Sequence, residues 1–254
     1  MTPTHRKQLN PQQLQVLYSL YNFRFGTTDL LANTQSKKVT RRYMNTRLRI
    51  LCEQDYIARR YDESSKRRIQ FASYYLLPKG IAVLKERPKD FRYQVLRNIR
   101  KDVNASDRFA EHCLNVFTLY AAFKELYGDD FTFYTKSHIS NVDYFPKPLP
   151  DAYVKFKKRE TGEKLRHYMI ECFDGTMPEF VMKQRIEALV NHADSGEWTA
   201  KTTYPNTLLV CGTDSLQKKA QKWADKALDQ GWADKLVITA TTKNTLAETL
   251  ALLA

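Results

Sequence analysis

Three carboxylates stand at the ends of two apolar stretches in the second half of the chain. Asp151 follows Pro150 and opens DAYVKFKK, whereas Glu171 and Asp174 close RHYMIECFDG. When neighbouring strands bring carboxylates to one end of a sheet, the oxygens can hold Mg²⁺, a hard cation that prefers oxygen ligands. A bound Mg²⁺ would stabilise charge on a phosphate and activate a water molecule. The pattern indicates either a metal-dependent nuclease with Asp151, Glu171 and Asp174 as metal ligands or two ordinary strands with acidic ends.

The elements that would position these carboxylates follow from apolar periodicity and turn residues. A helix is predicted over residues 106–128, where Ser106 caps the start and Gly128 ends it. The order that follows predicts a mixed sheet with helices on both faces. Strands are predicted over residues 131–136, 151–158, 166–173, 206–213 and 235–242, and further helices over residues 176–193, 215–231 and 244–254.

The first hundred residues predict three helices followed by a β-hairpin. Asn10 caps the first helix and Pro11 occupies its first position, while Thr28 caps the second. The third helix is predicted from a Ser36 cap to about Gln54. The hairpin over residues 56–77 turns at DESSK, and another helix begins at PKG. This succession is typical of a winged helix-turn-helix, whose third helix enters the major groove of DNA while the hairpin follows the backbone.

Charge on the third helix suits such docking. At 100° per residue, its cations fall on one stripe, opposite an apolar stripe that contains Val39, Tyr43, Met44, Leu48, Ile50 and Leu51. Arg47 falls inside the apolar stripe, and the sequence does not explain why a charged residue occupies this position. Lys and Arg neutralise phosphates, and Asn45 can read a base edge. The candidate DNA-binding residues are Lys37, Lys38, Arg41, Arg42, Asn45, Arg49, Arg59, Arg60, Lys66, Arg67 and Arg68.

The distribution of charge separates the two halves. Residues 1–105 carry 22 Lys and Arg against 8 Asp and Glu, whereas residues 106–254 carry 19 against 20. An excess of positive charge confined to one region favours an anionic partner, with nucleic acid ahead of a membrane surface, or else a solvated basic face.

Other features exclude several classes of protein. No apolar run is long enough to span a membrane, and the N-terminus lacks the apolar core of a secretory signal. Cys52, Cys113, Cys172 and Cys211 are far apart and form no CxxC pair, which argues against a zinc site or a disulfide framework. A reducing cytoplasmic location is expected.

The order of several short motifs resembles the replication-relaxation family of plasmid, phage and mobile-element proteins. In that family a winged helix precedes a domain similar to the PD-(D/E)XK nuclease-like superfamily, with an αβββαβ core. The resemblance implies an α+β or α/β chain with a winged helix-turn-helix over residues 1–95, a helical bridge over 96–105 and the nuclease-like domain over 106–254. The motifs are LYNFRFGTTDLL, RLRILCEQDYIARR, YYLLPKG, LPDA, and IECFDGT with the helix that follows it.

The same resemblance assigns roles in the second domain. Pro150-Asp151 stands in the PD place and Glu171 in the acidic place, but the superfamily's lysine position holds Phe173. Lys183, on the next helix, would have to replace that lysine, or it simply pairs with Glu187 one turn on. Asp151, Glu171 and Lys183 are therefore the candidate catalytic residues, with Mg²⁺ as the cofactor only if the site is active.

Three functions remain open on the sequence. The favoured one is an accessory protein of a plasmid or mobile element that binds double-stranded DNA, as a homodimer, in replication, relaxation, transfer or transcription control, with other replication or transfer proteins as further partners. The second is a Mg²⁺-dependent endonuclease that nicks DNA, which leaves the assignment as an enzyme undecided. The third is an adaptor whose basic face docks an acidic protein.

Overall fold

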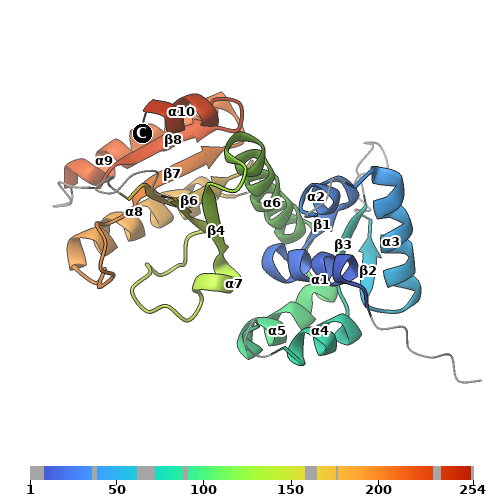
Figure 1. Ribbon diagram of the computed structural model, residues 1–254. Coiled ribbons are helices and arrows are strands. Elements are labelled where there is room, and N and C mark those ends of the chain that lie inside the picture. The colour runs from blue at the N-terminus through green and yellow to red at the C-terminus, as the bar shows by residue number, and fades with distance from the viewer. Residues whose placement is uncertain are drawn as a thin grey trace, which may run out of the picture. The chain divides into compact units, whose positions relative to one another are not determined.

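The computed structural model describes residues 9–35, 39–61, 72–87, 91–157, 165–175, 177–230 and 236–252 (Figure 1). The chain divides into two compact units, Met1–Phe117 and Thr118–Ala254. The division falls inside one helix, α6 (Asp107–Tyr127), whereas the sequence predicts domains over residues 1–95 and 106–254 with a bridge over 96–105. In the described part of the chain, no helix is both long and apolar enough to cross a bilayer.

The first unit contains helices α1 to α5 and a small antiparallel sheet in which β3 is the central strand, between β1 and β2. Asn10 caps α1 as predicted: its side chain accepts a hydrogen bond from the backbone N–H of Gln13 at 2.8 Å. The elements are α1 (Pro11–Phe23), β1 (Gly26–Thr27), α2 (Thr28–Asn33), α3 (Arg41–Glu53), β2 (Ile57–Arg60), β3 (Ser73–Leu76), α4 (Pro78–Lys85), α5 (Tyr93–Ile99) and a 3-10 turn over Arg100–Asn104.

Helix α3 starts later than the sequence predicts. Thr40 is its N-cap, because the Thr40 hydroxyl accepts from the backbone N–H of Tyr43 at 3.4 Å. The predicted cap, Ser36, lies outside the described residues. The helix ends at Glu53, next to the predicted end at Gln54.

The predicted bridge packs as part of the first unit. Val95, Leu96 and Ile99 are buried, and the carboxylate of Asp102 is bound by the guanidinium of Arg24. The burial of the apolar stripe on α5, together with an ion pair to Arg24 just after α1, makes this segment a packed part of the first unit.

The second unit is built on a five-stranded mixed sheet in the order β4-β5-β6-β7-β8. Strands β4, β5 and β6 are antiparallel, and β6, β7 and β8 are parallel. Each parallel connection contains a helix, as such connections require. The remaining elements are β4 (Phe131–Thr135), α7 (Lys136–Ile139), β5 (Ala152–Phe156), β6 (His167–Phe173), α8 (Glu179–Ser195), β7 (Asn206–Cys211), α9 (Asp214–Gln230), β8 (Ile238–Thr242) and α10 (Leu246–Leu252).

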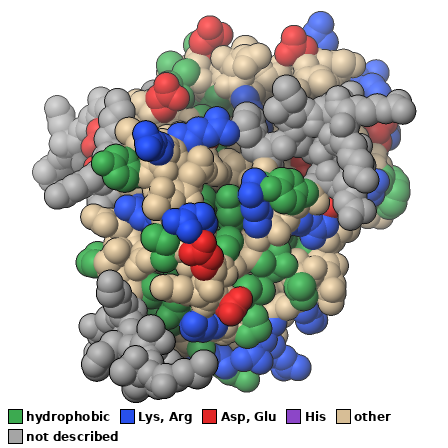
Figure 2. Space-filling model, turned by 90° about the vertical axis from the view of Figure 1, so that its right-hand side faces the viewer, with side chains coloured by type: hydrophobic (Ala, Val, Ile, Leu, Met, Phe, Trp, Pro, Cys, Tyr) green, Lys and Arg blue, Asp and Glu red, His purple; other side chains and the backbone are tan. Residues whose placement is uncertain are grey.

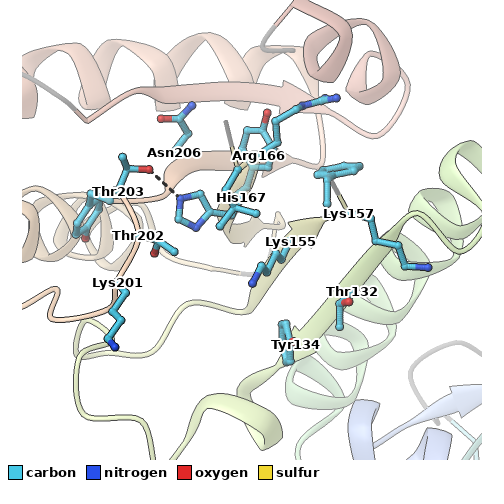
Figure 3. A pocket seen from close by; sticks show the side chains of 14 residues that line it. Thr132, Tyr134, Lys155, Lys157, Arg166, His167, Lys201, Thr202, Thr203 and Asn206 are labelled. Carbon is cyan, nitrogen blue, oxygen red and sulfur yellow. Dashed lines mark hydrogen bonds between the residues drawn. The ribbon is translucent and has the colours of Figure 1, made fainter. Parts of the chain in front are cut away.

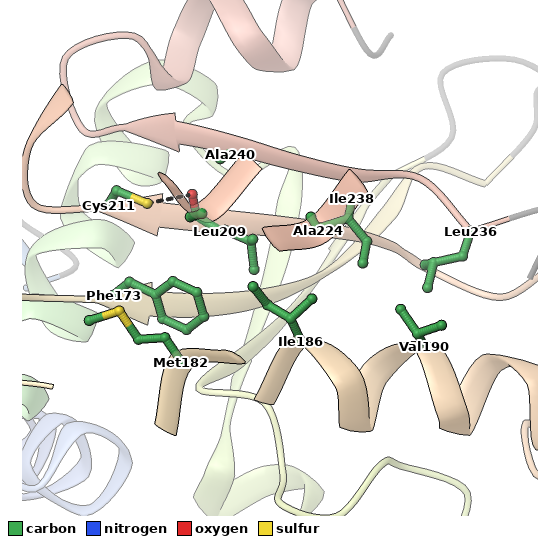
Figure 4. Packing of buried hydrophobic residues seen from close by; sticks show 11 residues of the cluster. Phe173, Met182, Ile186, Val190, Leu209, Cys211, Ala224, Leu236, Ile238 and Ala240 are labelled. Atoms are coloured by element: carbon green, nitrogen blue, oxygen red, sulfur yellow. Dashed lines mark hydrogen bonds between the residues drawn. The ribbon is translucent and has the colours of Figure 1, made fainter. Parts of the chain in front are cut away.

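Helices cover both faces of this sheet, as predicted. Met182 and Ile186 of α8 and Ala224 of α9 pack against Phe173 and Leu209 on one face (Figure 4). On the other face, Phe123 of α6 contacts the rings of Phe131, Phe133 and Phe156, and Thr249 of α10 shares a hydrogen bond with Thr241. Strand β6 is buried along its whole length, as its place in the middle of the sheet requires.

Candidate functional site

Helix α3 presents a cationic face to solvent. Arg41, Arg42, Asn45 and Arg49 are exposed, while Met44, Leu48 and Leu51 on the other side of the helix are fully buried. The separation follows from helical periodicity, because residues three and four apart share a face. Figure 2 views the side on which α3 lies in Figure 1 and shows Lys and Arg side chains with hydrophobic groups between them.

Weak internal contacts orient several of these side chains. Nε of Arg41 lies 3.5 Å from a carboxylate oxygen of Asp29, and Nη1 of Arg49 lies 2.6 Å from Glu53. Such exposed pairs contribute roughly 0–1 kcal/mol each, so a phosphate could replace the carboxylate. The hydroxyl of Thr28 donates to Oδ1 of Asn45 at 3.0 Å, which fixes the amide and leaves Oδ1 a second lone pair.

For α3, the prediction for Tyr43 is wrong, and the structure supplies the missing partner of Arg47. Tyr43, assigned to the apolar stripe, is 72% exposed and lies on the solvent side with the cations. Arg47 does lie on the half-buried side, where its Nη1 donates to Oε1 of Gln35 at 2.7 Å. Burial lowers the pKa of Arg47, and the hydrogen bond to Gln35 supplies the partner that its position requires.

The two arginines of β2 differ in their surroundings. Arg59 is exposed and its guanidinium lies 4.4 Å from the centre of the Tyr61 ring. Arg60 is half-buried and binds Asp107 at 2.5 Å. Arg59 is thus the more accessible of the two for an anionic partner. The other candidates, Lys37, Lys38, Lys66, Arg67 and Arg68, lie outside the described residues.

In the second unit, Asp151 and Glu171 come together. Ala152 is paired with Ile170 between β5 and β6, so the register places the preceding Asp151 opposite the following Glu171. Both side chains are 1% exposed. Asp151 accepts from the backbone N–H of Cys172 at 2.8 Å, which fixes one carboxylate oxygen against the neighbouring strand.

Two cations that the sequence analysis does not single out neutralise these carboxylates. Nε of Arg185 donates to Glu171 at 2.7 Å, and Nη2 lies 2.5 Å from the same oxygen and 3.6 Å from Asp151. Nζ of Lys136 lies 2.5 Å from Asp151. Arg185 also donates to the carbonyl of Leu149 at 3.0 Å. We call Asp151, Glu171, Lys136 and Arg185 the carboxylate cluster.

Lys183 lies on a different side of α8. Two residues along a helix correspond to a rotation of about 200°, so Lys183 and Arg185 point in nearly opposite directions. Because Arg185 faces Glu171, Lys183 faces away, and its Nζ lies 5.0 Å from the centre of the Trp223 ring on α9. Phe173, at the superfamily's lysine position, is 1% exposed and packs in the apolar core (Figure 4).

Burial dominates the electrostatics of the cluster. It raises the pKa of Glu171 to about 7, and the Asp151 carboxylate adds to the rise, while Arg185 and Lys136 act in the opposite direction. Burial also lowers the pKa of Arg185, but the attraction of Glu171 and Asp151 outweighs it, so the pKa of Arg185 is raised overall. The cluster is a compensated set of charges in a site with little solvent.

These residues do not fit a resident Mg²⁺. Asp151 and Glu171 already bind two cations, and Asp151 also accepts a backbone N–H. Asp174 is buried nearby in sequence, and its carbonyl accepts from the N–H of Met177 at 3.2 Å. Among the residues that the structure describes, no group of three or more His, Cys, Asp or Glu side chains is arranged to hold a metal ion. We therefore derive no metal-dependent step.

Comparison with known families decides the affiliation of the chain. The family model described as replication-relaxation matches residues 17–206. The chain belongs to the replication-relaxation family. Membership suggests a role in the replication or relaxation of mobile elements. A search of curated proteins finds no match.

A sequence signal for the missed residues of this replication-relaxation protein exists in retrospect. Arg185 falls in the stripe of α8 formed by Met182, Ile186 and Leu189, which are all buried. A cation inside an apolar stripe needs a buried partner, as Arg47 does on α3. Lys136 carries a weaker signal, because it only follows the last residue of β4.

The raised pKa of Glu171 predicts how stability of the replication-relaxation protein depends on pH. The pKa of Glu171 is about 7 in the folded state, above the ordinary 4.5. The contribution of this group to the free energy of unfolding is therefore complete below about pH 4.5 and is lost as the pH rises through 7. The loss is at most about 3 kcal/mol. Urea unfolding at pH 4.5 and pH 8 should show that Glu171→Gln resembles the wild type at the lower pH and is more stable at the higher. Identical pH dependence of both proteins would contradict the assignment.

Proposed function

We propose that the first unit is a winged helix that binds duplex DNA as part of replication or relaxation of a mobile element. The order of α1, α2 and α3, followed by the antiparallel pair β2–β3 with β1 on the other side of β3, supports this interpretation. In such folds the third helix docks in the major groove and the hairpin runs along the backbone.

The exposed cationic face of α3 carries the proposal. Arg41, Arg42 and Arg49 are available to phosphates or guanine edges, and Asn45, held by Thr28, is available to a base. Tyr43 adds an exposed aromatic ring to the same surface. Since one winged helix reads few base pairs, binding as a dimer to two half-sites is part of the proposal.

Arg42→Ala tests the proposed interface. Fluorescence anisotropy with a labelled duplex of about 30 base pairs should show binding at low salt by the wild type. Removing one phosphate contact should weaken binding to all sequences alike and flatten the slope of log K against log salt by about one unit.

Arg97→Ala is the matched control for that experiment, because Arg97 is an exposed arginine on α5, away from α3. It should leave both the affinity and the salt slope close to those of the wild type. Absence of duplex binding by the wild type at low salt, or equal losses in the two variants, would refute DNA binding through α3.

For the second unit we propose a PD-(D/E)XK-like fold in which the carboxylates have a structural role as partners of Arg185 and Lys136 and hold no metal. The succession α6, β4, β5, β6, α8, β7 and the juxtaposition of Asp151 with Glu171 support the likeness. The engagement of both carboxylates by Lys136 and Arg185 supports the structural role. Magnesium-dependent nicking of supercoiled plasmid that disappears in Glu171→Gln would overturn that role.

A further inference from the structure

A cavity of ≈ 840 Å³ lies in the second unit, at the end of β5 and β6 opposite the carboxylate cluster. Asp151 precedes β5, whereas Lys155 lies near the last residue of that strand and His167 begins β6. Figure 3 shows that the lining side chains come from β4, β5, β6 and the segment before β7. The described lining residues are Thr132, Tyr134, Lys155, Phe156, Lys157, Leu165, Arg166, His167, Tyr168, Lys201, Thr202, Thr203, Tyr204 and Asn206.

The charge of this cavity has one sign. Lys155, Lys157, Arg166 and Lys201 line it, and the described lining residues include no carboxylate. This concentration stands out in a half of the chain where basic and acidic residues nearly balance. A hollow lined by charges of one sign focuses the electric field and raises the local concentration of the opposite ion. The natural ligand of this cavity is therefore an anion.

Two buried hydrogen-bond donors without partners in the described part of the chain also favour a ligand that accepts hydrogen bonds. Nε of Arg166 and Oγ1 of Thr202 are buried, and neither has a hydrogen-bond partner among the described residues. Burying a polar atom without a partner is costly, so a ligand that accepts hydrogen bonds there would remove the cost. The remaining guanidinium of Arg166 is fixed, because Nη2 donates to the carbonyl of Leu250 at 3.2 Å.

His167 organises the wall and does not itself carry charge at neutral pH. Its ring shares a hydrogen bond with Tyr153 at 2.7 Å. It shares a second one with Thr203 at 3.3 Å (Figure 3). Burial, and then the charge of Lys155, lower the pKa of His167 to about 4. The positive charge of the cavity therefore comes from its lysines and arginine.

Size and aromatic content narrow the class of anion. A cavity of ≈ 840 Å³ exceeds what an inorganic ion fills and falls in the range of small-molecule sites. Tyr134 and Tyr204 are half-buried in its wall, and aromatic rings are sequence-tolerant platforms for nucleobases. We propose that this cavity binds a nucleotide unit, with its phosphate held by Lys155 and Lys201 and its base against the tyrosine-containing wall.

The phosphate-bearing unit has two possible sources, a free mononucleotide or a residue of a single strand. Binding of dAMP to the full chain, measured by calorimetry at low salt, reports the first. Anisotropy of a labelled 10-nucleotide single strand reports the second. The variant Lys155→Glu with Lys201→Glu should weaken binding of whichever probe the wild type takes by about tenfold or more.

Lys218→Glu is the matched control, since Lys218 is an exposed lysine on α9 that does not line the cavity, and it should change affinity by less than about twofold. Protection of Lys155 and Lys201 from acetylation by dAMP or by the single strand, read by mass spectrometry on the wild type, tests the site without any substitution. The proposal is overturned if neither probe binds, if adenosine binds as tightly as dAMP while the strand does not bind, or if binding protects neither lysine. Arg42→Ala should leave dAMP binding unchanged, so failure here is distinguishable from failure of duplex binding by α3.

Discussion

Arg185→Met is expected to lower the free energy of unfolding of the second unit by about 3–5 kcal/mol, because it leaves buried carboxylates without their shared counter-charge. Arg185 contacts Glu171 at 2.7 Å and lies 3.6 Å from Asp151, and both carboxylates are 1% exposed. Methionine retains most of the apolar stem but none of the five donors. Urea unfolding followed by tryptophan fluorescence measures the effect, since Trp198, Trp223 and Trp232 all belong to the second unit.

Lys183→Met is the matched control on the same helix. Lys183 is exposed and lies over the ring of Trp223, a contact worth about 0.5–1 kcal/mol at such sites. Adding Glu171→Gln to Arg185→Met should recover part of the loss, because one buried charge disappears. Equal losses in the two methionine variants, or no recovery in the double variant, would show that unpaired buried carboxylates are not the cause of the loss.

Gly80→Ala is expected to destabilise the first unit by about 3 kcal/mol through overpacking. A Cβ at position 80 would lie 2.3 Å from the backbone oxygen of Tyr56 and 3.2 Å from its carbonyl carbon. That oxygen already accepts from the N–H of Leu77 at 3.0 Å, so it cannot yield without loss of a hydrogen bond. Thermal unfolding by circular dichroism and duplex binding should both show the damage.

Gly175→Ala is the control for Gly80→Ala, because it replaces a glycine by alanine where no clash is expected. Gly175 has no left-handed backbone, and an added Cβ would meet no heavy atom within 4 Å among the described residues. We expect a change within about 0.5 kcal/mol. In Gly80→Ala the tryptophan-detected unfolding of the second unit should stay near that of the wild type. A wild-type melting profile for Gly80→Ala would mean that α4 can move away from Tyr56.

The sequence predicts well those features that depend on local signals. Asn10 and Pro11 fix the start of α1, and strand alternation with register brings Asp151 and Glu171 together. Short elements such as β1 and α7 were not predicted, because two or four residues show no periodicity. The N-cap of α3 is Thr40, whereas the sequence predicts Ser36, and both residue types are favoured at N-cap positions.

Tertiary contacts explain the remaining differences. Tyr43 is apolar enough to be assigned to a core, yet its exposure depends on which neighbours approach α3. Arg185 contacts the carboxylates and Lys183 does not, because the side of α8 that carries Arg185 faces the sheet. In the sequence, only the apolar stripe of α8 indicates which side that is. Lys136 reaches Asp151 from the end of β4, a meeting of segments that sequence spacing does not encode.

The carboxylate cluster also bears on how such domains diverge. Asp151 and Glu171 face each other, and Arg185 of α8 lies between them. Arg185 and Lys136 together offset the negative charge of the two carboxylates. A descendant that lost Arg185 would retain two opposed oxygen donors in need of compensation, and a divalent ion is the simplest substitute. Arg185 alone therefore keeps the space between these two carboxylates filled by a cation that belongs to the protein itself.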